Sequence, residues 1–491
     1  MIGPFDSLRD YIAALDSKGL LVRIPKMDQD KYEATGFAYQ LVKEFGYDLA
    51  PAFLIEEIKV NNQWMKGPVL GNIFGGWSSE ALMYGIENLG ENQKIARQKT
   101  SDHLEALYRK LNQWPKIPPI EITSDGCPCK ENILLGDDVD VTKFPWLHTN
   151  PADAGQYLNA AMIFIEDPDL GRNVAPYRCQ IKEKDKIGVN AEIQQNAWNF
   201  LMKMKKQGKK VAPIAVVNGV DPITFTLGAS KLAQLGEDEL DFVGGFRNKA
   251  VELVKCETNN ILVPANCEIV LEGEVPLDAM EKEGPYGEMY GFMGLEKEQN
   301  FFMNIKAITH RDNPWIVNSF AGVTKISPSI LQTVVNLIDY KEAIPSLLDI
   351  YRPAESTGVL IVSIDKQNSG EGMATGKILA EKDFFGKVII IVDRDIDVYD
   401  KGEIFQALGT RWQPHPAAEI IEETRGMPLD ASAPKRFQTS KIIIDATRQF
   451  SEEGGPNIWP EISKVMLEKL SPETFDLIEQ NWENYFINWK R

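Results

Sequence analysis

The hydrophobic pattern divides the chain into three folded regions and a tail. In the first region, helical periodicity over 5–45 and 79–113 alternates with a strand-like apolar run at 50–58. Alternation of the two periods favours an α/β domain over residues 1–120. The Pro-rich junction WPKIPPIEI (114–122) marks its end.

Beyond this junction the pattern is that of many short strands. Helical periodicity is confined to 192–208 and 237–250. Alternating or β-branched runs recur at 157–167, 175–181, 210–219, 267–275 and 302–310. Many short strands with few helices predict a β-barrel or a β-sandwich over residues 121–321.

The pattern changes again near residue 322. Continuous apolar runs, which are typical of buried parallel strands, occur at 358–364, 387–393 and 441–447. A helical stretch at 372–382 lies between the first two, so residues 322–450 are predicted to form a second α/β domain. The tail, 451–491, is predicted to be helical. It is rich in Trp and Phe, and its apolar face needs a partner surface, for which a second subunit is one candidate.

Composition is ordinary for a soluble globular protein, and a cytoplasmic location is expected. Of 491 residues, 43% are hydrophobic and 25% charged, and the net charge of −18 argues against nonspecific binding to nucleic acid or anionic membranes. No run approaches the ~18 apolar residues of a membrane span. The N-terminus is typical of an amphipathic helix rather than a signal peptide. Five cysteines, an odd number, indicate reduced thiols.

The segment KEGPYGEMYG (282–291) places two carboxylates, Glu283 and Glu288, around a stretch that contains Gly284 and Pro285. Proline and glycine exclude a helix, and positions five apart would point to opposite faces of a flat strand. A turn could aim both acids at one point, where mutual repulsion would favour a proton on one of them. The alternative is an ordinary surface turn with solvated acids.

Arg178 lies among apolar residues in APYRCQI (175–181). A buried arginine needs a carboxylate partner, and Glu283 and Glu288 are candidates. The alternative is a surface arginine on an edge strand. Glu239 lies at the acidic start of a predicted helix, where its ordinary explanation is a charge that stabilises the helix N-terminus.

Other reaction classes find little support. The Gly-rich SGEGMATGK (369–377) does not match a phosphate loop. The spacing of its glycines differs, and Ile378 stands where Ser or Thr is required. The chain has no G-x-S-x-G elbow, and its four histidines are scattered. The CPC at 127–129 has no second Cys pair or nearby His to complete a zinc set.

Four segments in order resemble the UbiD family of prenylated-FMN-dependent decarboxylases and carboxylases. They are FPWLHTNPADAGQYLNAAMIF (144–164), NVAPYRCQI (173–181), VKCETNNILVPANCEIVLEGEV (254–275) and EGPYGEMYG (283–291), which has Tyr where the family has Phe. The resemblance implies an N-terminal α/β domain, a split β-barrel that holds the cofactor, and a C-terminal α/β domain used in oligomerisation.

The same resemblance implies a catalytic network of Arg178, Glu283 and Glu288. Glu288 would be the main proton donor, and Arg178 would bind the substrate carboxylate and hold Glu283. The implied reaction is reversible, non-oxidative decarboxylation of an aromatic, heteroaromatic or α,β-unsaturated acid. Loss of CO₂ from an sp² carbon needs an electron sink that no side chain offers, so a cofactor must supply it.

The implied cofactor is prenylated FMN, held through a divalent metal, Mn²⁺ or Mg²⁺, with K⁺ nearby. The metal ligands would be Asn173, Gln195 and Glu239, and Gln195 is a departure because the family has His there. An amide oxygen suits Mg²⁺ or Mn²⁺ but is a weaker ligand than imidazole for transition metals. Cofactor contacts would also involve Pro176, Tyr177, Arg178, Ser230 and Lys441.

The implied partners are a small carboxylic acid, CO₂, a flavin prenyltransferase that supplies the cofactor, and further copies of the chain in a homodimer or larger homo-oligomer. Two alternatives stay open. One is a subunit of a multi-subunit aromatic carboxylase. The other is a flavin- or metal-binding protein without turnover, which the change to Gln195 keeps open and the complete Arg–Glu–Glu set argues against.

Overall fold

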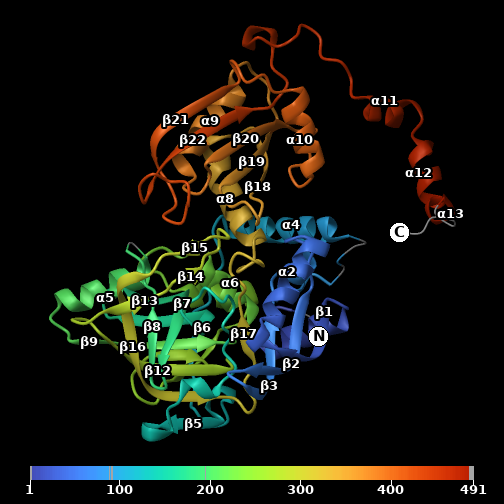
Figure 1. Ribbon diagram of the computed structural model, residues 1–491. Helices are drawn as coiled ribbons and strands as arrows, with labels where there is room; N and C mark the ends of the chain where they lie inside the picture. Colours follow the sequence, from blue (N-terminus) through green and yellow to red (C-terminus); the bar gives the residue numbers. More distant parts are fainter. Residues whose placement is uncertain (1–2, 88, 90–91, 194, 486–491) are drawn as a thin grey trace. The chain divides into compact units, whose positions relative to one another are not determined.

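The computed structural model describes residues 3–87, 89, 92–193 and 195–485 (Figure 1). They form two compact units. The N-terminal unit runs to residue 343 and includes 352–358 and 425–439, and the C-terminal unit comprises 344–351, 359–424 and the chain from 440. The predicted helical stretches at 79–113 and 192–208 and the predicted helical tail, 451–491, include residues outside the described set, namely 88, 90, 91, 194 and 486–491.

The N-terminal unit begins with a mixed sheet of order β1-β2-β3-β17, which confirms the predicted α/β character (Figure 1, where β1, β2 and β3 are blue). Its strands are β1 (Leu21–Asp28), β2 (Ala52–Val60), β3 (Gln63–Gly71) and β17 (Ile316–Asn318). The helices of this region are α1 (Leu8–Ser17), α2 (Glu33–Phe45), α3 (Trp77–Met83) and α4 (Gln93–Leu111).

The prediction of helix throughout 5–45 is wrong over β1, which pairs in parallel with β2. Pro25 explains the difference. Inside a helix it would remove a hydrogen bond and clash with the preceding turn, whereas an edge strand tolerates its missing N–H. β1 is an edge strand of this sheet.

A closed β-barrel follows, which decides between the predicted barrel and sandwich. Its strands are β6 (Tyr157–Asp167), β7 (Gly171–Glu183), β8 (Lys186–Val189), β9 (Val211–Asn218), β12 (Ile269–Pro276) and β16 (Lys297–His310). They pair in the order β12-β9-β6-β7-β8-β16, and an antiparallel β12–β16 ladder closes the ring. Closure removes the unpaired edges that an open sheet of this size would expose.

Three helices accompany the barrel: α5 (Asn196–Lys206), α6 (Pro222–Ala229) and α7 (Glu239–Arg247). Helices were predicted at α5 and α7 but not at α6. Seven of the eight residues of α6 are buried, so it lacks the polar face that makes a helical period visible in a sequence. Asp221 caps its start by accepting hydrogen bonds from the N–H groups of Ile223 and Thr224.

Shorter elements complete this unit. β4 (Ile120–Glu121), β10 (Glu252–Lys255) and β11 (Leu262–Pro264) form a small sheet. β5 (Asn132–Leu135) and β13 (Glu281–Glu283) pair with β16, β14 (Tyr286–Gly287) pairs with β15 (Met293–Gly294), and α8 (Ile330–Ala343) follows.

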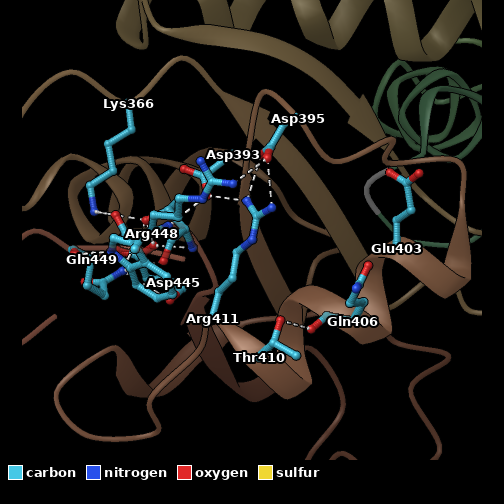
Figure 2. A network of polar contacts seen from close by, with 12 residues as sticks. Lys366, Asp393, Asp395, Glu403, Gln406, Thr410, Arg411, Asp445, Arg448 and Gln449 are labelled. Atoms are coloured by element: carbon cyan, nitrogen blue, oxygen red, sulfur yellow. Dashed lines mark hydrogen bonds and ion pairs between the residues drawn. The ribbon is translucent and has the colours of Figure 1, made fainter. Parts of the chain in front are cut away.

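The C-terminal unit is a five-stranded sheet of order β18-β19-β20-β22-β21. Its elements are β18 (Leu347–Tyr351), β19 (Val359–Ile364), α9 (Glu371–Lys382), β20 (Val388–Asp393), α10 (Lys401–Thr410), β21 (Ala418–Arg425) and β22 (Gln438–Asp445). β19, β20 and β22 are parallel neighbours, which confirms the interpretation of the three continuous apolar runs. Figure 2 shows a cluster of ion pairs at the carboxyl ends of β20 and β22.

The tail contains three short helices, α11 (Ser463–Leu470), α12 (Glu473–Gln480) and α13 (Trp482–Tyr485), as predicted. None of their residues is buried. Within the described part of the chain, no helix has both the length and the apolar character required to cross a membrane.

Candidate active site

The structure brings Arg178, Glu283 and Glu288 together on one side of the barrel strand β7. Arg178 donates two parallel hydrogen bonds to Glu283, from Nε to Oε1 at 2.9 Å and from Nη2 to Oε2 at 3.0 Å. Its remaining nitrogen, Nη1, donates to Oε1 of Glu288 at 2.5 Å. The arginine therefore joins two acids that lie 105 and 110 residues away in the sequence.

The local fold explains how both acids reach one cation. Glu283 ends β13, which is held against β16 by the Glu283–Lys297 pairing. Gly284 then adopts a φ of +84°, a conformation that a residue with a side chain rarely takes, and the chain turns. Glu288 follows the two-residue strand β14, so the carboxylates approach Arg178 from both sides of the turn.

Burial separates the roles available to the two acids. The Glu283 side chain is 1% exposed, while that of Glu288 is 14% exposed and that of Arg178 is 9% exposed. Burial alone would lower the pKa of Arg178, but the hydrogen bonds and charges of both glutamates outweigh it and raise that pKa. Glu283 is thus a fixed anchor for the cation, and Glu288 is the more accessible acid.

Two tyrosines that no sequence signal marked as functional complete this face. Arg178 lies over the ring of Tyr286, 4.7 Å from its centre. Tyr286 in turn packs against Tyr157, with ring centres 4.6 Å apart. Burial raises the pKa of Tyr286 and of Tyr157, so both phenols stay neutral and give the cation an aromatic wall.

The turn itself is held from outside by the segment before β6. Asp153 accepts a hydrogen bond from the N–H of Gly287 at 2.7 Å, and the N–H of Ala154 donates to the carbonyl of Pro285 at 2.8 Å. Asp153 was also missed as a site residue. The turn-forming composition of NPADAG (150–155) was the available signal, but it does not reveal what the turn contacts.

Asn173 and Glu239, two of the predicted metal ligands, lie near the same strand. Asn173 is 2% exposed, and neither its side-chain oxygen nor its nitrogen makes a hydrogen bond of ordinary geometry. Glu239 accepts a hydrogen bond from the N–H of Val174 at 2.9 Å. Burial raises the pKa of Glu239 to about 8. The unsatisfied amide oxygen of Asn173 and the buried carboxylate of Glu239 are oxygen donors of the types that suit a hard cation.

Gln195, the third predicted ligand, is exposed at the start of α5. Its side-chain oxygen accepts a hydrogen bond from the N–H of Glu192 at 2.8 Å. As a metal ligand it would have to exchange this bond for the cation. In the described residues, no group of three or more His, Cys, Asp or Glu side chains is arranged to hold a metal.

The predicted cofactor contacts fall in both units. Tyr177 is buried on β7, its hydroxyl accepts from the N–H of Ala197, and burial raises its pKa to about 12. Pro176 precedes it and is half-buried. Ser230 caps α6 and donates to the carbonyl of Leu227. Lys441 belongs to the C-terminal unit, where its ammonium donates to the carbonyls of Ala380 and Asp383 at 2.8 and 2.5 Å.

This arrangement can bind an anion and deliver a proton at the same place. One cation faces two carboxylates, so the trio carries a net negative charge unless one acid holds a proton. Glu288, with one hydrogen bond from Arg178 and greater exposure, is the acid better placed to take and give the proton.

Two family models match this chain. Residues 121–324 match the 3-octaprenyl-4-hydroxybenzoate carboxy-lyase Rift-related domain of UbiD, and residues 331–446 match the corresponding C-terminal domain. The first match covers the barrel and the turn that carries Glu283 and Glu288.

Curated and solved relatives agree with these models. The phenolic acid decarboxylase of Sedimentibacter hydroxybenzoicus is 28% identical over 483 residues, covering 92% of this chain and 93% of that protein. The vanillic acid decarboxylase of the same organism, in its closed form, aligns with a TM-score of 0.78 at 26% identity, over 96% and 99% of the two chains. An evolved dimeric form of the UbiD-class enzyme HmfF from Pelotomaculum thermopropionicum, in complex with prenylated FMN, aligns with a TM-score of 0.76 at 26% identity, over 95% and 99%.

Proposed function

The chain belongs to the UbiD family of carboxy-lyases, and from this premise we propose that it is a prenylated-FMN-dependent decarboxylase. The reaction is reversible, non-oxidative removal of CO₂ from an aromatic, heteroaromatic or α,β-unsaturated carboxylic acid. The single observation that carries the proposal is the buried fork of Arg178 on Glu283 and Glu288. This set pairs an anion-binding cation with a proton donor at one point, which is what the reaction needs from the protein.

The residues near β7 fit the cofactor's metal and phosphate. Asn173 offers a buried amide without a partner, and Glu239 offers a buried carboxylate whose raised pKa favours a bound cation as a replacement for its proton. These two residues would hold Mn²⁺ or Mg²⁺, with Gln195 as a third ligand after its oxygen leaves the N–H of Glu192. Pro176, Tyr177 and Ser230, all in the N-terminal unit, are proposed as further cofactor contacts, and K⁺ as a second ion.

When bound, prenylated FMN supplies the electron sink that amino-acid side chains lack. Arg178 binds the substrate carboxylate and orients it, while Glu283 keeps the guanidinium in its plane through two parallel hydrogen bonds. Tyr286 and Tyr157 exclude water from one side of the cation, which strengthens its attraction for the carboxylate.

Glu288 holds the proton that completes the reaction. As the bond between the substrate carbon and its carboxyl group breaks and CO₂ leaves, the proton passes from a carboxyl oxygen of Glu288 to that carbon. Glu288 regains a proton from solvent, to which its 14% exposure gives access. In the carboxylation direction the same carboxylate accepts the proton.

The test begins with cofactor content. The chain is co-expressed with a flavin prenyltransferase, purified without oxygen, and examined by visible absorption, mass spectrometry of the released cofactor and metal analysis. We expect prenylated FMN and about one divalent metal per chain, and CO₂ release from a panel of hydroxybenzoic, furoic and cinnamic acids.

The decisive control is Glu288→Gln on the same preparation. It should keep the cofactor and lose both CO₂ release and exchange of the product's ring or vinyl hydrogen with D₂O. A loaded wild-type protein that exchanges no hydrogen and releases no CO₂ from any member of the panel would contradict the proposal.

A further inference from the structure

Asp153 lies outside the Arg–Glu–Glu set and yet contacts its backbone. It stands in the loop before β6 and is 7% exposed. Its Oδ1 accepts the hydrogen bond from the N–H of Gly287 at 2.7 Å, and Gly287 is the residue before Glu288. A bond from a backbone amide to an ionised carboxylate is roughly twice as strong as one between neutral groups.

The other oxygen of Asp153 is also engaged, so the carboxylate cannot turn away. Oδ2 accepts from the hydroxyl of Thr149 and from the N–H of Asn150, both at 3.1 Å. Burial raises the pKa of Asp153, although the N–H of Gly287 and the hydroxyl of Thr149 oppose this shift. Retaining an acid in this place is costly, and its hydrogen bonds are what offset that cost.

The turn depends on this contact because it has little secondary structure of its own. β14 is two residues long and pairs only with β15. Other bonds also support the turn. The N–H of Ala154 and the hydroxyl of Tyr157 donate to the carbonyl of Pro285 at 2.8 and 3.4 Å, and the N–H of Glu288 donates to the carbonyl of Phe292 at 2.9 Å. The bond to Asp153 is the one that ties the residue before Glu288 to the loop before β6.

Substrate binding makes the contact more important. Glu288 is held in place by Nη1 of Arg178, the nitrogen that is not used on Glu283. A substrate carboxylate bound to Arg178 competes for the same nitrogen. Once Glu288 has yielded this bond, its position depends on the backbone of the turn, and Asp153 is what fixes the amide directly before it.

We propose that Asp153 is a positioning residue for proton transfer: by holding the N–H of Gly287 it keeps Glu288 in reach of the substrate carbon after the substrate has replaced Glu288 on Arg178. The inference rests on the proposed role of Glu288 as the proton donor. Both carboxylate oxygens of Asp153 are occupied by Gly287, Thr149 and Asn150, so its contribution belongs to the chemical step rather than to binding.

The experiment compares Asp153→Ala and Asp153→Asn in the cofactor-loaded full chain. The amide oxygen of Asn can still accept from Gly287, whereas Ala cannot. Removing a hydrogen bond to a charged group corresponds to about a 10- to 100-fold effect, so Asp153→Ala should lower kcat by this factor and leave KM within about twofold. Asp153→Asn should recover most of the loss.

Asp140→Ala is the matched control. Asp140 also caps a turn, by accepting from the N–H and hydroxyl of Thr142, but it has no bond to the 283–288 segment. It should change thermal stability by a similar amount and leave kcat unchanged. An unchanged kcat in Asp153→Ala, or an Asn variant as slow as the Ala variant while both remain folded, would overturn the inference.

Hydrogen–deuterium exchange separates this inference from the proposed function. Asp153→Ala should speed exchange at the amide of Gly287, and Asp153→Asn should not. If Asp153→Ala speeds exchange at Gly287 but the wild-type protein releases no CO₂, the contact holds the turn and the proposed reaction is wrong. Unchanged exchange at Gly287 would overturn the positioning role whatever the activity.

Discussion

Each unit of this protein contains an arginine between two acids, and the two clusters differ in charge balance. In the N-terminal unit Arg178 forms ion pairs with Glu283 and Glu288. In the C-terminal unit Arg411 donates to Asp393 at 2.7 Å and to both oxygens of Asp395 at 2.7 and 2.9 Å (Figure 2). Both arginines are largely buried.

The C-terminal cluster has a second cation. Arg448 donates its backbone N–H to Asp393 at 2.8 Å and its side chain to Asp395 at 3.1 Å (Figure 2). Burial alone would raise the pKa of Asp395, but the hydrogen bonds and charge of Arg411 outweigh it and the pKa is lowered. At Asp393 burial outweighs the hydrogen bonds of Arg411 and Arg448 and raises the pKa. The two aspartates are matched in number by two arginines, which suits a structural tie between strand ends.

Among the residues that the structure describes, Arg178 is the one cation paired with Glu283 and Glu288. Glu283 takes two of the hydrogen bonds from Arg178, which leaves Glu288 with one. An acid that is held but not fully compensated can exchange its proton and respond to an arriving anion. The two clusters therefore differ in one respect: Glu288 shares its only arginine with Glu283, and this is the property that the proposed proton transfer uses. The predictions below test that difference.

The largest effect should come from Glu288→Gln. It removes the proton donor and keeps the shape of the side chain, so kcat should fall by about 10³-fold, within the usual range for general acid catalysis. KM and cofactor content should change little. Asp395→Asn is the corresponding change in the balanced cluster, and steady-state kinetics should give it a wild-type kcat. Equal losses in the two variants would remove the distinction between the clusters.

The second effect is on stability. Arg411→Met leaves two aspartates without their main cation, and the free energy of unfolding should fall by about 2 kcal/mol. This is less than the full cost of breaking a buried ion pair, because the side chain of Asp395 is 36% exposed. Urea denaturation at pH 7 measures the change. The kcat of the folded fraction should stay at the wild-type value, and a large loss of kcat would show that this cluster has a catalytic part.

A smaller effect should follow Gly294→Ala. A Cβ at this position would lie 2.6 Å from Oε1 of Glu288, so the carboxylate must move from its place beside Arg178. Because the obstructing atom is the end of a flexible side chain, the fold should survive, with a fall in kcat of about tenfold. Gly291→Ala is a comparison outside this contact, although its φ of +78° adds backbone strain.

The smallest effect separates the predicted metal ligands. Asn173→Ala removes a buried amide that has no other partner, and it should weaken metal binding by at least about tenfold. Gln195→Ala removes an exposed side chain already bonded to Glu192, and metal content should change by less than about twofold. Metal analysis after dialysis against a chelator distinguishes the two, and a larger loss in Gln195→Ala would make Gln195 the stronger ligand.

Particular residues show how far the sequence could lead. The apolar runs of β19 and β20 identified parallel strands because both faces of such strands are buried. The pairing of Arg178 with Glu283 was expected because a buried guanidinium requires an acid. β1 was missed because it is a short amphipathic segment that was included in the helical pattern around it, although Pro25 argues against a helix there. α6 was missed because burial on all sides removes the helical period from its sequence.

The sequence by itself determined the type of chemistry and the set of residues that are proposed to perform it. The ordered motifs identified the family. Gly284 and Pro285 predicted a bend between the two acids, Glu283 and Glu288. Only the tertiary structure decided which acid is anchored and which is accessible, since this depends on burial by β16 and on contacts made over more than 100 residues. The same holds for Asp153, because a hydrogen bond to the N–H of Gly287 from 134 residues away leaves no periodic trace in the sequence.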